Sequence, residues 1–297
     1  MKHTPVLLDE SIEALNLKRG DVVIDATLGN GGHSLAIANK IGKNGLLVGI
    51  DVDPGALSEA KKCLSATGVP HKLIRGNFRD LKELTEQVGV STANAVLADL
   101  GWRTEQFTVG SGKGLSFEAD EPLHMTLGEP TDYPFRAEDI VNEWSEETIA
   151  NILYGYGQER YARRIASSIV ASRKKERIST SGQLSGLIKQ AVPVSYRNGR
   201  IHPATRSFQA LRIAVNDELG ALDKFLPQGF EILSGGGRLA VISFHSLEDR
   251  KVKHMFRDFV HDQCAVLVNK KPITATRQEI LANPRSRSAK LRIIEKI

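Results

Sequence analysis

Apolar residues in the first hundred positions gather in short runs that are separated by helix-like segments. The strand-like runs cover residues 21–28, 46–53, 71–78 and 93–101, and the segments between them place apolar residues three and four apart. This alternation predicts a parallel, doubly wound sheet with helices on both faces. Strand-like patterns return at 235–244 and 286–297. We therefore expect the α/β class.

The region between these two parts has a different pattern. Residues 102–200 hold few strand-like runs and several amphipathic helical ones, such as ERYARRIASSIVASRK and SGQLSGLIKQAV. The simplest interpretation is an inserted all-helical domain at 105–205, which interrupts an α/β domain formed by residues 1–104 and 206–297.

Composition excludes several classes of protein. The chain has 297 residues, of which 41% are hydrophobic and 25% charged, so collagen-like and disordered proteins do not fit. Two cysteines, Cys63 and Cys264, are too few for a disulfide framework. No apolar run reaches the roughly 18 residues of a membrane span, and the N-terminus does not match a signal peptide. We expect a cytoplasmic protein with no membrane partner.

A glycine-rich turn and a later acid suggest a nucleoside site. Residues 25–34 read DATLGNGGHS where a strand passes into a helix, and Asp51 ends the next strand. Glycines at such a junction let backbone N–H groups approach an anionic ligand, and the strand-end acid suits a ribose. A dinucleotide site or a turn without a ligand would give the same pattern.

Two details favour S-adenosylmethionine over a dinucleotide. The D-x-T-x-G-x-G spacing is similar to the loop of class I methyltransferases, with Thr27 in place of the first glycine. The third and fourth strands end near Phe78, whose ring suits an adenine face, and at Asp99, at the expected catalytic edge. A core role for Phe78 is the competing interpretation.

The helical pattern at 202–219 carries an apolar stripe and a separate polar stripe. The polar stripe consists of Arg206, Gln209, Arg212 and Asn216. Two guanidinium groups and two amides suit phosphates and base edges, which makes these residues substrate-binding candidates, although a solvated helix face would look the same.

His245 follows the strand-like run at 235–244 and begins the sequence HSLEDR. The carboxyl end of a strand is where doubly wound folds bind ligands, so His245 is a further substrate-binding candidate. A helix start with Ser246 as N-cap explains part of the pattern. Metal-ligand spacing is absent, and we expect no metal.

Charge is segregated along the chain although the net charge is only +5. Residues 102–159 carry a net −9, residues 160–212 a net +11 and residues 250–297 a net +8. Two concentrated basic segments indicate a surface that faces a polyanion such as RNA.

Taken together, these motifs resemble the ribosomal RNA small-subunit methyltransferase H family. The resemblance runs from HTPVLLDE at 3–10, through HPATRSFQALRIAVNDEL at 202–219 and GGRLAVISFHSLEDR at 236–250, to NPRSRSAKLR at 283–292. It implies a class I, seven-stranded Rossmann-like sheet, S-adenosylmethionine as cofactor, and methylation of the exocyclic N4 amine of a cytosine in the decoding region of 16S rRNA. The partner is then the small ribosomal subunit; a homodimer is left open.

The resemblance also implies roles for individual residues. Gly31, Gly32 and His33 would contact the methionine end of the cofactor, Asp51 its ribose and Phe78 its adenine. Asp99 and Gln106 would complete the pocket near the sulfur, and Asp99, by side chain or backbone carbonyl, is the catalytic candidate. The helical insert would be the substrate-recognition domain.

The loop at 102–127 departs from the family pattern, reading GWRTEQF and GLSF where relatives read GVSSPQLD and GFSF. This difference motivates a second hypothesis, a cofactor-binding ribosome-assembly factor with weakened catalysis, and a third, a methyltransferase with a changed target base. A dinucleotide oxidoreductase has no identifiable hydride-transfer site.

Overall fold

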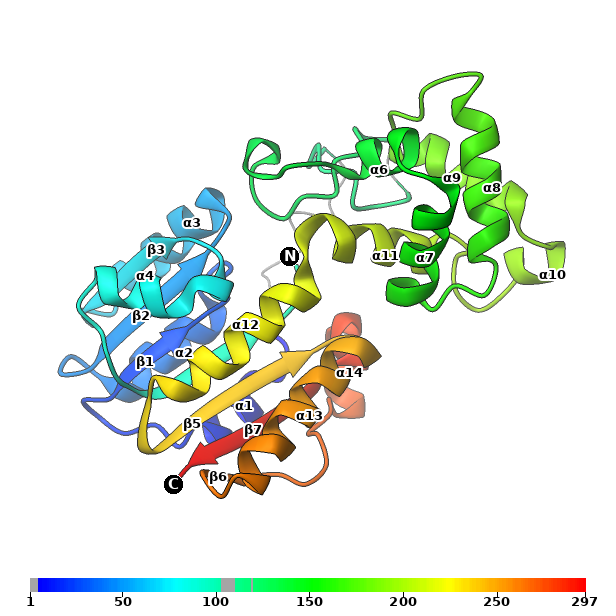
Figure 1. The fold of residues 1–297 in the computed structure, drawn as a ribbon. Coiled ribbons are helices and arrows are strands. Elements are labelled where there is room, and N and C mark those ends of the chain that lie inside the picture. The colour runs from blue at the N-terminus through cyan, green and yellow to red at the C-terminus, as the bar shows by residue number, and fades with distance from the viewer. Residues whose placement is uncertain (1–4, 103–109, 119) are drawn as a thin grey trace. The chain divides into compact units, whose positions relative to one another are not determined.

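In the computed structural model, which describes residues 5–102, 110–118 and 120–297, one sheet is built from seven strands (Figure 1). The strands are β1 (Val22–Asp25), β2 (Leu46–Asp51), β3 (His71–Arg75), β4 (Ala93–Asp99), β5 (Leu233–Ser243), β6 (Ala265–Leu267) and β7 (Lys290–Lys296). Their order is β3-β2-β1-β4-β5-β7-β6. The first five strands run parallel, and β7 pairs antiparallel with both β5 and β6.

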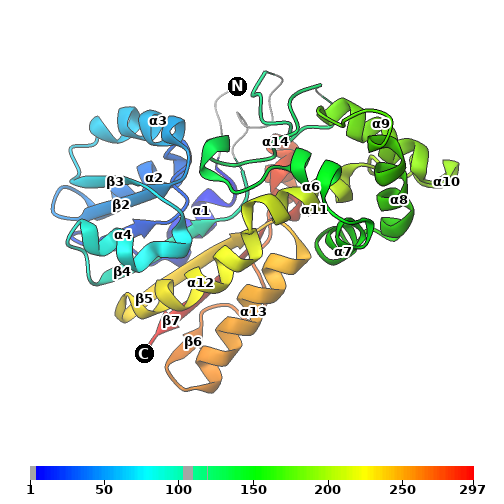
Figure 2. The ribbon, with the colours of Figure 1, turned by 45° about the horizontal axis from the view of Figure 1, so that its top comes forward.

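Helices cover both faces of this sheet, as Figures 1 and 2 show. They are α1 (Leu8–Ala14), α2 (Gly32–Ile41), α3 (Pro54–Ser65), α4 (Leu81–Gln87), α12 (Glu218–Glu231), α13 (Ser246–His261) and α14 (Arg277–Ala282), with 3-10 turns η1 (Phe78–Asp80) and η3 (Pro284–Ser288). Helices α1, α2 and α3 share one core with the sheet, whereas α4, α12 and α13 share the other.

The alternation of side chains along each strand produces these two cores. In β4, Ala95 and Leu97 face the core of α2 and α3, whereas Val96 and Ala98 face the core of α12 and α13. All four side chains are fully buried. Strands that are covered on both faces read as continuous apolar runs, which is the pattern found in the sequence.

The predicted α/β class and its seven-stranded sheet are confirmed. Strand β6 is the one that the sequence pattern did not predict. It has only three residues at the edge of the sheet, and one of them, Val266, is 46% exposed. So short a run has too few positions for an alternation to be recognised.

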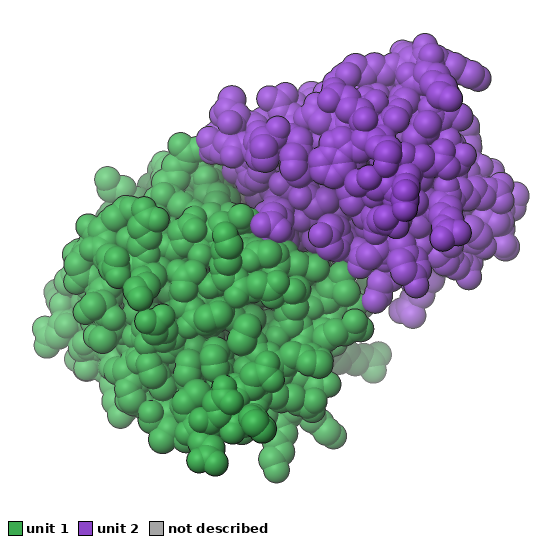
Figure 3. Space-filling view, in the orientation of Figure 1, with its two compact units in different colours: residues 1–102, 219–297 green, residues 103–218 purple. Residues whose placement is uncertain are grey.

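The chain divides into two compact units, which Figure 3 colours separately. Unit 1 consists of residues 1–102 and 219–297, and unit 2 of residues 103–218. The helices of unit 2 are α6 (Ala137–Glu143), α7 (Glu146–Gly157), α8 (Ala162–Arg173), α9 (Ser181–Ala191), α10 (Val194–Arg197) and α11 (Thr205–Asn216), with the 3-10 turn η2 (Pro130–Asp132). They enclose a core of their own.

The second boundary between the units differs from the expected one by about one helix. We expected the α/β domain to resume at residue 206, but α11 lies in unit 2. The apolar stripe of α11 explains the difference, because Phe208, Leu211 and Val215 are buried in the core of unit 2 with residues of α7 and α8.

Close packing of α7 against α11 gives a test of the unit 2 core. A Cβ atom added to Gly157 would lie 2.5 Å from the carbonyl oxygen of Arg206 and 3.1 Å from Cβ of Ala210. We expect Gly157→Ala to lower the free energy of unfolding by about 1–3 kcal/mol, measured by urea denaturation, because the two helices must separate.

Gly155 provides the matched control on the same helix. No atom lies within 4 Å of a Cβ added there. Gly155→Ala should leave stability unchanged or raise it by up to about 1 kcal/mol, since alanine favours a helix. Equal effects of the two substitutions would contradict this account of the α7–α11 contact.

Candidate functional site

Three carboxylates meet at the carboxyl edge of the sheet in unit 1. Asp25, Asp51 and Asp99 are the last residues of β1, β2 and β4. Because β1 pairs in parallel with both β2 and β4, the three strand ends lie side by side. This edge is where doubly wound folds bind ligands.

Asp25 is an internal support of this edge. Its side chain is 1% exposed, and it accepts hydrogen bonds from the Ser34 hydroxyl at 2.6 Å and from the Thr27 backbone N–H at 3.3 Å. Burial raises the pKa of Asp25 to about 6, against the lowering effect of these two hydrogen bonds. Asp25 therefore anchors the first turn of α2 to the end of β1.

Asp51 shapes the glycine turn. One carboxylate oxygen accepts the Gly29 N–H at 2.8 Å, and the other accepts the Asp53 N–H at 2.9 Å. Asp53 in turn is the N-cap of α3 and accepts the Gly55 N–H at 2.8 Å. One carboxylate thus fixes both the turn after β1 and the turn after β2, and a carboxylate has further acceptor capacity for hydroxyl groups.

The two glycines at the start of α2 are required by packing. Gly31 is the N-cap of α2, with a left-handed φ of 81° that favours glycine. A Cβ on Gly31 would lie 3.1 Å from Cβ of Ala60, and one on Gly32 would lie 2.3 Å from Cγ of Pro5. Glycine at these two positions therefore lets the start of α2 pack closely against Ala60 and Pro5. The backbone N–H groups at the start of a helix suit an anionic ligand.

His33 and Thr27 lie next to Asp99. Nε2 of the buried His33 is 3.0 Å from the Val6 carbonyl oxygen, and because a carbonyl only accepts, Nε2 carries the proton. Nδ1 of His33 lies 3.8 Å from Oδ2 of Asp99. The backbone N–H of Asp99 donates to the Thr27 hydroxyl at 2.6 Å. Thr27, which replaces a glycine of the usual loop, thus joins the ends of β1 and β4.

The surroundings of Asp99 disfavour the ionised form of its carboxyl group. Burial raises its pKa well above the usual value of 3.8, and the nearby charges of Asp25 and Glu248 raise it further. Within the described residues, no group donates to Oδ1 of Asp99. A buried acceptor without a donor costs free energy, and this suggests that a ligand supplies the donor.

Phe78 lies just beyond β3, at the first position of η1. Its ring is half-buried and packs edge to face against Phe225 of α12, with 5.1 Å between centroids. The preceding Asn77 accepts the Arg79 N–H and so fixes the turn. Phe78 therefore packs against the core that α4, α12 and α13 share with the sheet, and its contact with an adenine stays a prediction.

The polar stripe of α11 divides into two pairs. Arg206 and Gln209 are half-exposed, and Arg206 donates to the Gln158 carbonyl at 3.2 Å. Gln106, the other residue expected to border the pocket, lies outside the described residues.

Arg212 and Asn216 require a correction, because both are buried structural groups of unit 2. Arg212 is 3% exposed and makes a two-pronged ion pair with Glu218, at 2.7 and 2.8 Å. The Asn216 amide donates to the Met125 carbonyl and accepts the Leu127 N–H, each at 2.8 Å. The helical spacing of these polar residues predicted a substrate-binding stripe. Arg212 and Asn216 instead form their ion pair and hydrogen bonds with other residues of unit 2.

His245 is the N-cap of α13, the position that the sequence suggested for Ser246. Its ring accepts the Glu248 N–H, and a Glu248 oxygen accepts the backbone N–H groups of Phe244 and His245 at 2.8 and 3.2 Å. This reciprocal capping box orders the loop after β5. Glu248 is 3% exposed and also raises the pKa of Asp99, a role that sequence reasoning missed.

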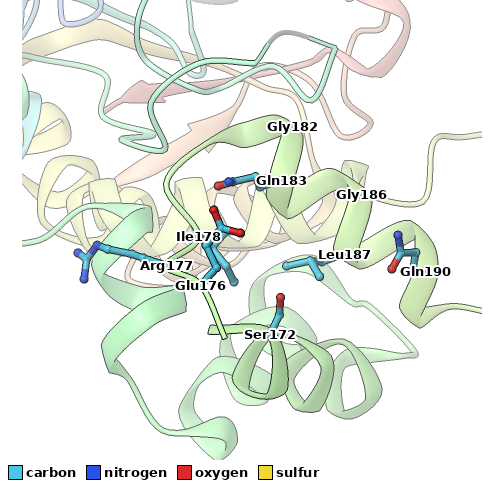
Figure 4. A pocket seen from close by; sticks show the side chains of 9 residues that line it. All are labelled: Ser172, Glu176, Arg177, Ile178, Gly182, Gln183, Gly186, Leu187 and Gln190. Carbon is cyan, nitrogen blue, oxygen red and sulfur yellow. The ribbon is translucent and has the colours of Figure 1, made fainter. Parts of the chain in front are cut away.

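A hollow lies wholly within unit 2 (Figure 4). It lies between the C-terminal part of α8 and α9 and is lined by residues such as Ser172, Glu176, Leu187 and Gln190. Figure 4 shows a mixed lining without converging charges, and none of the predicted site residues contributes to it.

No helix within the described part of the chain combines the length and apolar character needed to cross a bilayer.

Comparison with known proteins finds relatives along the whole length of the chain. The chain is 41% identical to ribosomal RNA small subunit methyltransferase H of Brevibacillus brevis, over 99% of this chain and 98% of that relative. It is 43% identical to the protein of the same name from Symbiobacterium thermophilum, over 99% of this chain and 96% of that relative. Residues 1–297 match the MraW methylase family. The chain therefore belongs to the MraW methylase family, which confirms the predicted methyltransferase and its cofactor, S-adenosylmethionine.

Proposed function

We propose that this protein methylates the exocyclic N4 amine of a cytosine in the decoding region of 16S rRNA. The observation that carries the proposal is the part-buried Asp99 carboxylate beside the glycine turn, whose buried Oδ1 accepts no hydrogen bond from the described residues. Two findings support the substrate class: the relatives named above are ribosomal RNA methyltransferases, and residues 160–212 carry a net charge of +11.

The residues at the strand-end edge fit S-adenosylmethionine. In our proposal, Gly31, Gly32 and His33 bind its methionine end, Asp51 its ribose hydroxyls and Phe78 its adenine. The fit rests on the side-chain-free start of α2, the carboxylate at the end of β2 and the accessible ring after β3. The bound cofactor supplies an activated methyl group, so the protein has only to prepare the acceptor.

Preparation of the acceptor is the task we assign to Asp99. The lone pair of the cytosine amine is delocalised into the ring, which makes the amine a poor nucleophile. An acceptor that takes a hydrogen bond from the amine N–H favours the localised lone pair and stabilises the positive charge that develops on nitrogen. Oδ1 of Asp99 is an acceptor of this kind, and its ionised form is the active one.

The target base has to leave its stack before it can reach such a site, as other base-modifying enzymes require. Exposed basic side chains of unit 2 would hold the flanking phosphates and make binding dependent on salt. We propose the helical unit as the substrate-recognition domain on this ground.

Asp51 gives the test of the cofactor site. We expect Asp51→Ala to weaken S-adenosylmethionine binding by about 10- to 100-fold in calorimetry, because hydrogen bonds to a charged group and the order of the glycine turn are lost together. Glu86→Ala removes an exposed carboxylate of the same unit and serves as the control. Unchanged affinity in Asp51→Ala would argue against this cofactor position.

Asp99 gives the test of the chemistry. With tritium-labelled cofactor, the wild-type protein should label 16S rRNA or small subunits, and Asp99→Ala should reduce the rate at least about 100-fold. Asp258→Asn, which removes an exposed acid on α13, should retain the wild-type rate. Absence of any label from the wild type would favour the assembly-factor hypothesis, and mass spectrometry of the labelled RNA would reveal a changed target base.

The raised pKa of Asp99 also predicts how stability depends on pH. The folded state holds the Asp99 proton to higher pH than the unfolded state does, so ionisation costs stability as the pH rises above about 4. Asp99→Asn removes that cost. Its melting temperature should therefore exceed that of the wild type by more at pH 8 than at pH 5. An advantage that is equal at both values, or absent at pH 8, would contradict the assignment.

A further inference from the structure

A guanidinium group rests on two tyrosine rings where α7 and α8 meet in unit 2. The Arg160 guanidinium carbon lies 4.9 Å from the ring centroid of Tyr161 and 4.7 Å from that of Tyr196. The two rings themselves meet edge to face, with 5.0 Å between centroids. We call these three residues the Arg160 platform. Contact with both rings restricts the orientation of the planar guanidinium.

A buried carboxylate holds the platform in place. Glu159 is 0% exposed, and it accepts the Tyr196 hydroxyl at 2.7 Å and the Tyr161 N–H at 2.9 Å. Burial and the Glu159 carboxylate together raise the pKa of Tyr196 to about 12, so its hydroxyl stays protonated and keeps donating. Both tyrosines are therefore tied to the same buried group while Arg160 remains exposed.

Apart from the ring contacts of Arg160, the basic groups at the platform make no stabilising contact with the residues that the structure describes. Arg160, Arg163 and Arg164 are exposed, and none of them forms a hydrogen bond or ion pair with the described residues. The last two lie in the first turn of α8, which contains no acid. Cations at a helix N-terminus oppose the helix dipole, so this arrangement costs stability. Residues that lower the stability of the fold in this way are typical of binding surfaces.

The surface also has an aromatic character. Tyr154, one turn before the end of α7, is 70% exposed. The Arg206 guanidinium donates to the Gln158 carbonyl and lies close enough to Tyr196 to lower the pKa of that tyrosine. Basic side chains interleaved with accessible rings match single-stranded nucleic acid, whose bases stack while its phosphates pair with arginine.

We propose that the Arg160 platform stacks an unpaired base of the RNA substrate while Arg163 and Arg164 bind the phosphates on either side. This inference rests on the proposed function for its choice of RNA, and it adds a single-strand contact at a named place in the helical unit. A guanidinium packed against two rings has fewer orientations open to it, and its planar group can stack on a base while its N–H groups donate to phosphate.

The test measures RNA affinity of the full-length protein without cofactor, so its outcome is independent of methyl transfer. The probe is a fluorescein-labelled single-stranded RNA of 20 nucleotides, followed by anisotropy, with a 20-base-pair RNA duplex and polyglutamate as comparison ligands. We expect Arg160→Ala to weaken single-strand binding by about tenfold and duplex binding by less than twofold, since stacking needs an unpaired base. Arg19→Ala, which removes an exposed arginine of unit 1, should change neither.

Two further variants separate stacking from charge and from folding. Arg160→Lys keeps the positive charge but replaces the planar guanidinium with an ammonium group that cannot stack on a base. It should lose nearly as much affinity for single-stranded RNA as Arg160→Ala. Tyr196→Phe loses the hydroxyl bond to Glu159 but keeps the ring; it should melt at a lower temperature yet bind RNA within about twofold of the wild type. Wild-type affinity in Arg160→Lys, equal losses for duplex and single strand, or tighter binding of polyglutamate than of RNA would each overturn the proposal.

Discussion

The site depends on a constraint that the parallel sheet imposes. The carboxylates of Asp25, Asp51 and Asp99, at the ends of three adjacent strands, must lie side by side where they are partly shielded from water. Repulsion among them is reduced in a different way for each. Asp25 receives the Ser34 hydroxyl and is largely protonated below its pKa of about 6. Asp51 is neutralised in part by two backbone N–H groups. Oδ1 of Asp99 receives no hydrogen bond from the described residues, and burial raises the pKa of Asp99.

This division of roles links folding to chemistry. The carboxylates of Asp25 and Asp51, which accept hydrogen bonds from the chain, position the glycine turn and the start of α2. In our proposal, Oδ1 of Asp99 is the acceptor that a ligand uses. Thr27 shows how closely the two functions are joined, because its hydroxyl fixes the backbone of Asp99 without touching the carboxylate. A glycine at that position could not make this bond. Sites that retain an unsatisfied, destabilising group are typical of catalysis.

Much of this arrangement could be predicted from the sequence, because strand-end residues follow from the apolar runs that precede them. Asp51, Asp99 and the glycine turn were identified in this way. The sequence pattern cannot show which polar side chains form hydrogen bonds or ion pairs within the chain and so are not available to a ligand. Arg212 and Asn216 share helical spacing with Arg206, yet Glu218 and the loop at 125–127 occupy them. The partners of Arg212 and Asn216 lie far away in the sequence or beyond a turn. The local periodicity therefore cannot distinguish a buried side chain that pairs within the chain from an exposed one that is free to bind a ligand.

The same distinction changes the meaning of the +11 charge on residues 160–212. Several of these cations bind backbone carbonyls at helix ends: Arg173 donates to the carbonyls of Val141 and Trp144 at the C-terminal end of α6, and Arg197 to those of Gln190 and Val192 at the C-terminal end of α9. Cations at helix C-termini are stabilising, so these need no ligand to explain them. The charge left for a polyanion is therefore smaller than the segment total. Three of the remaining cations, Arg160, Arg163 and Arg164, lie around the start of α8, where the helix dipole disfavours positive charge.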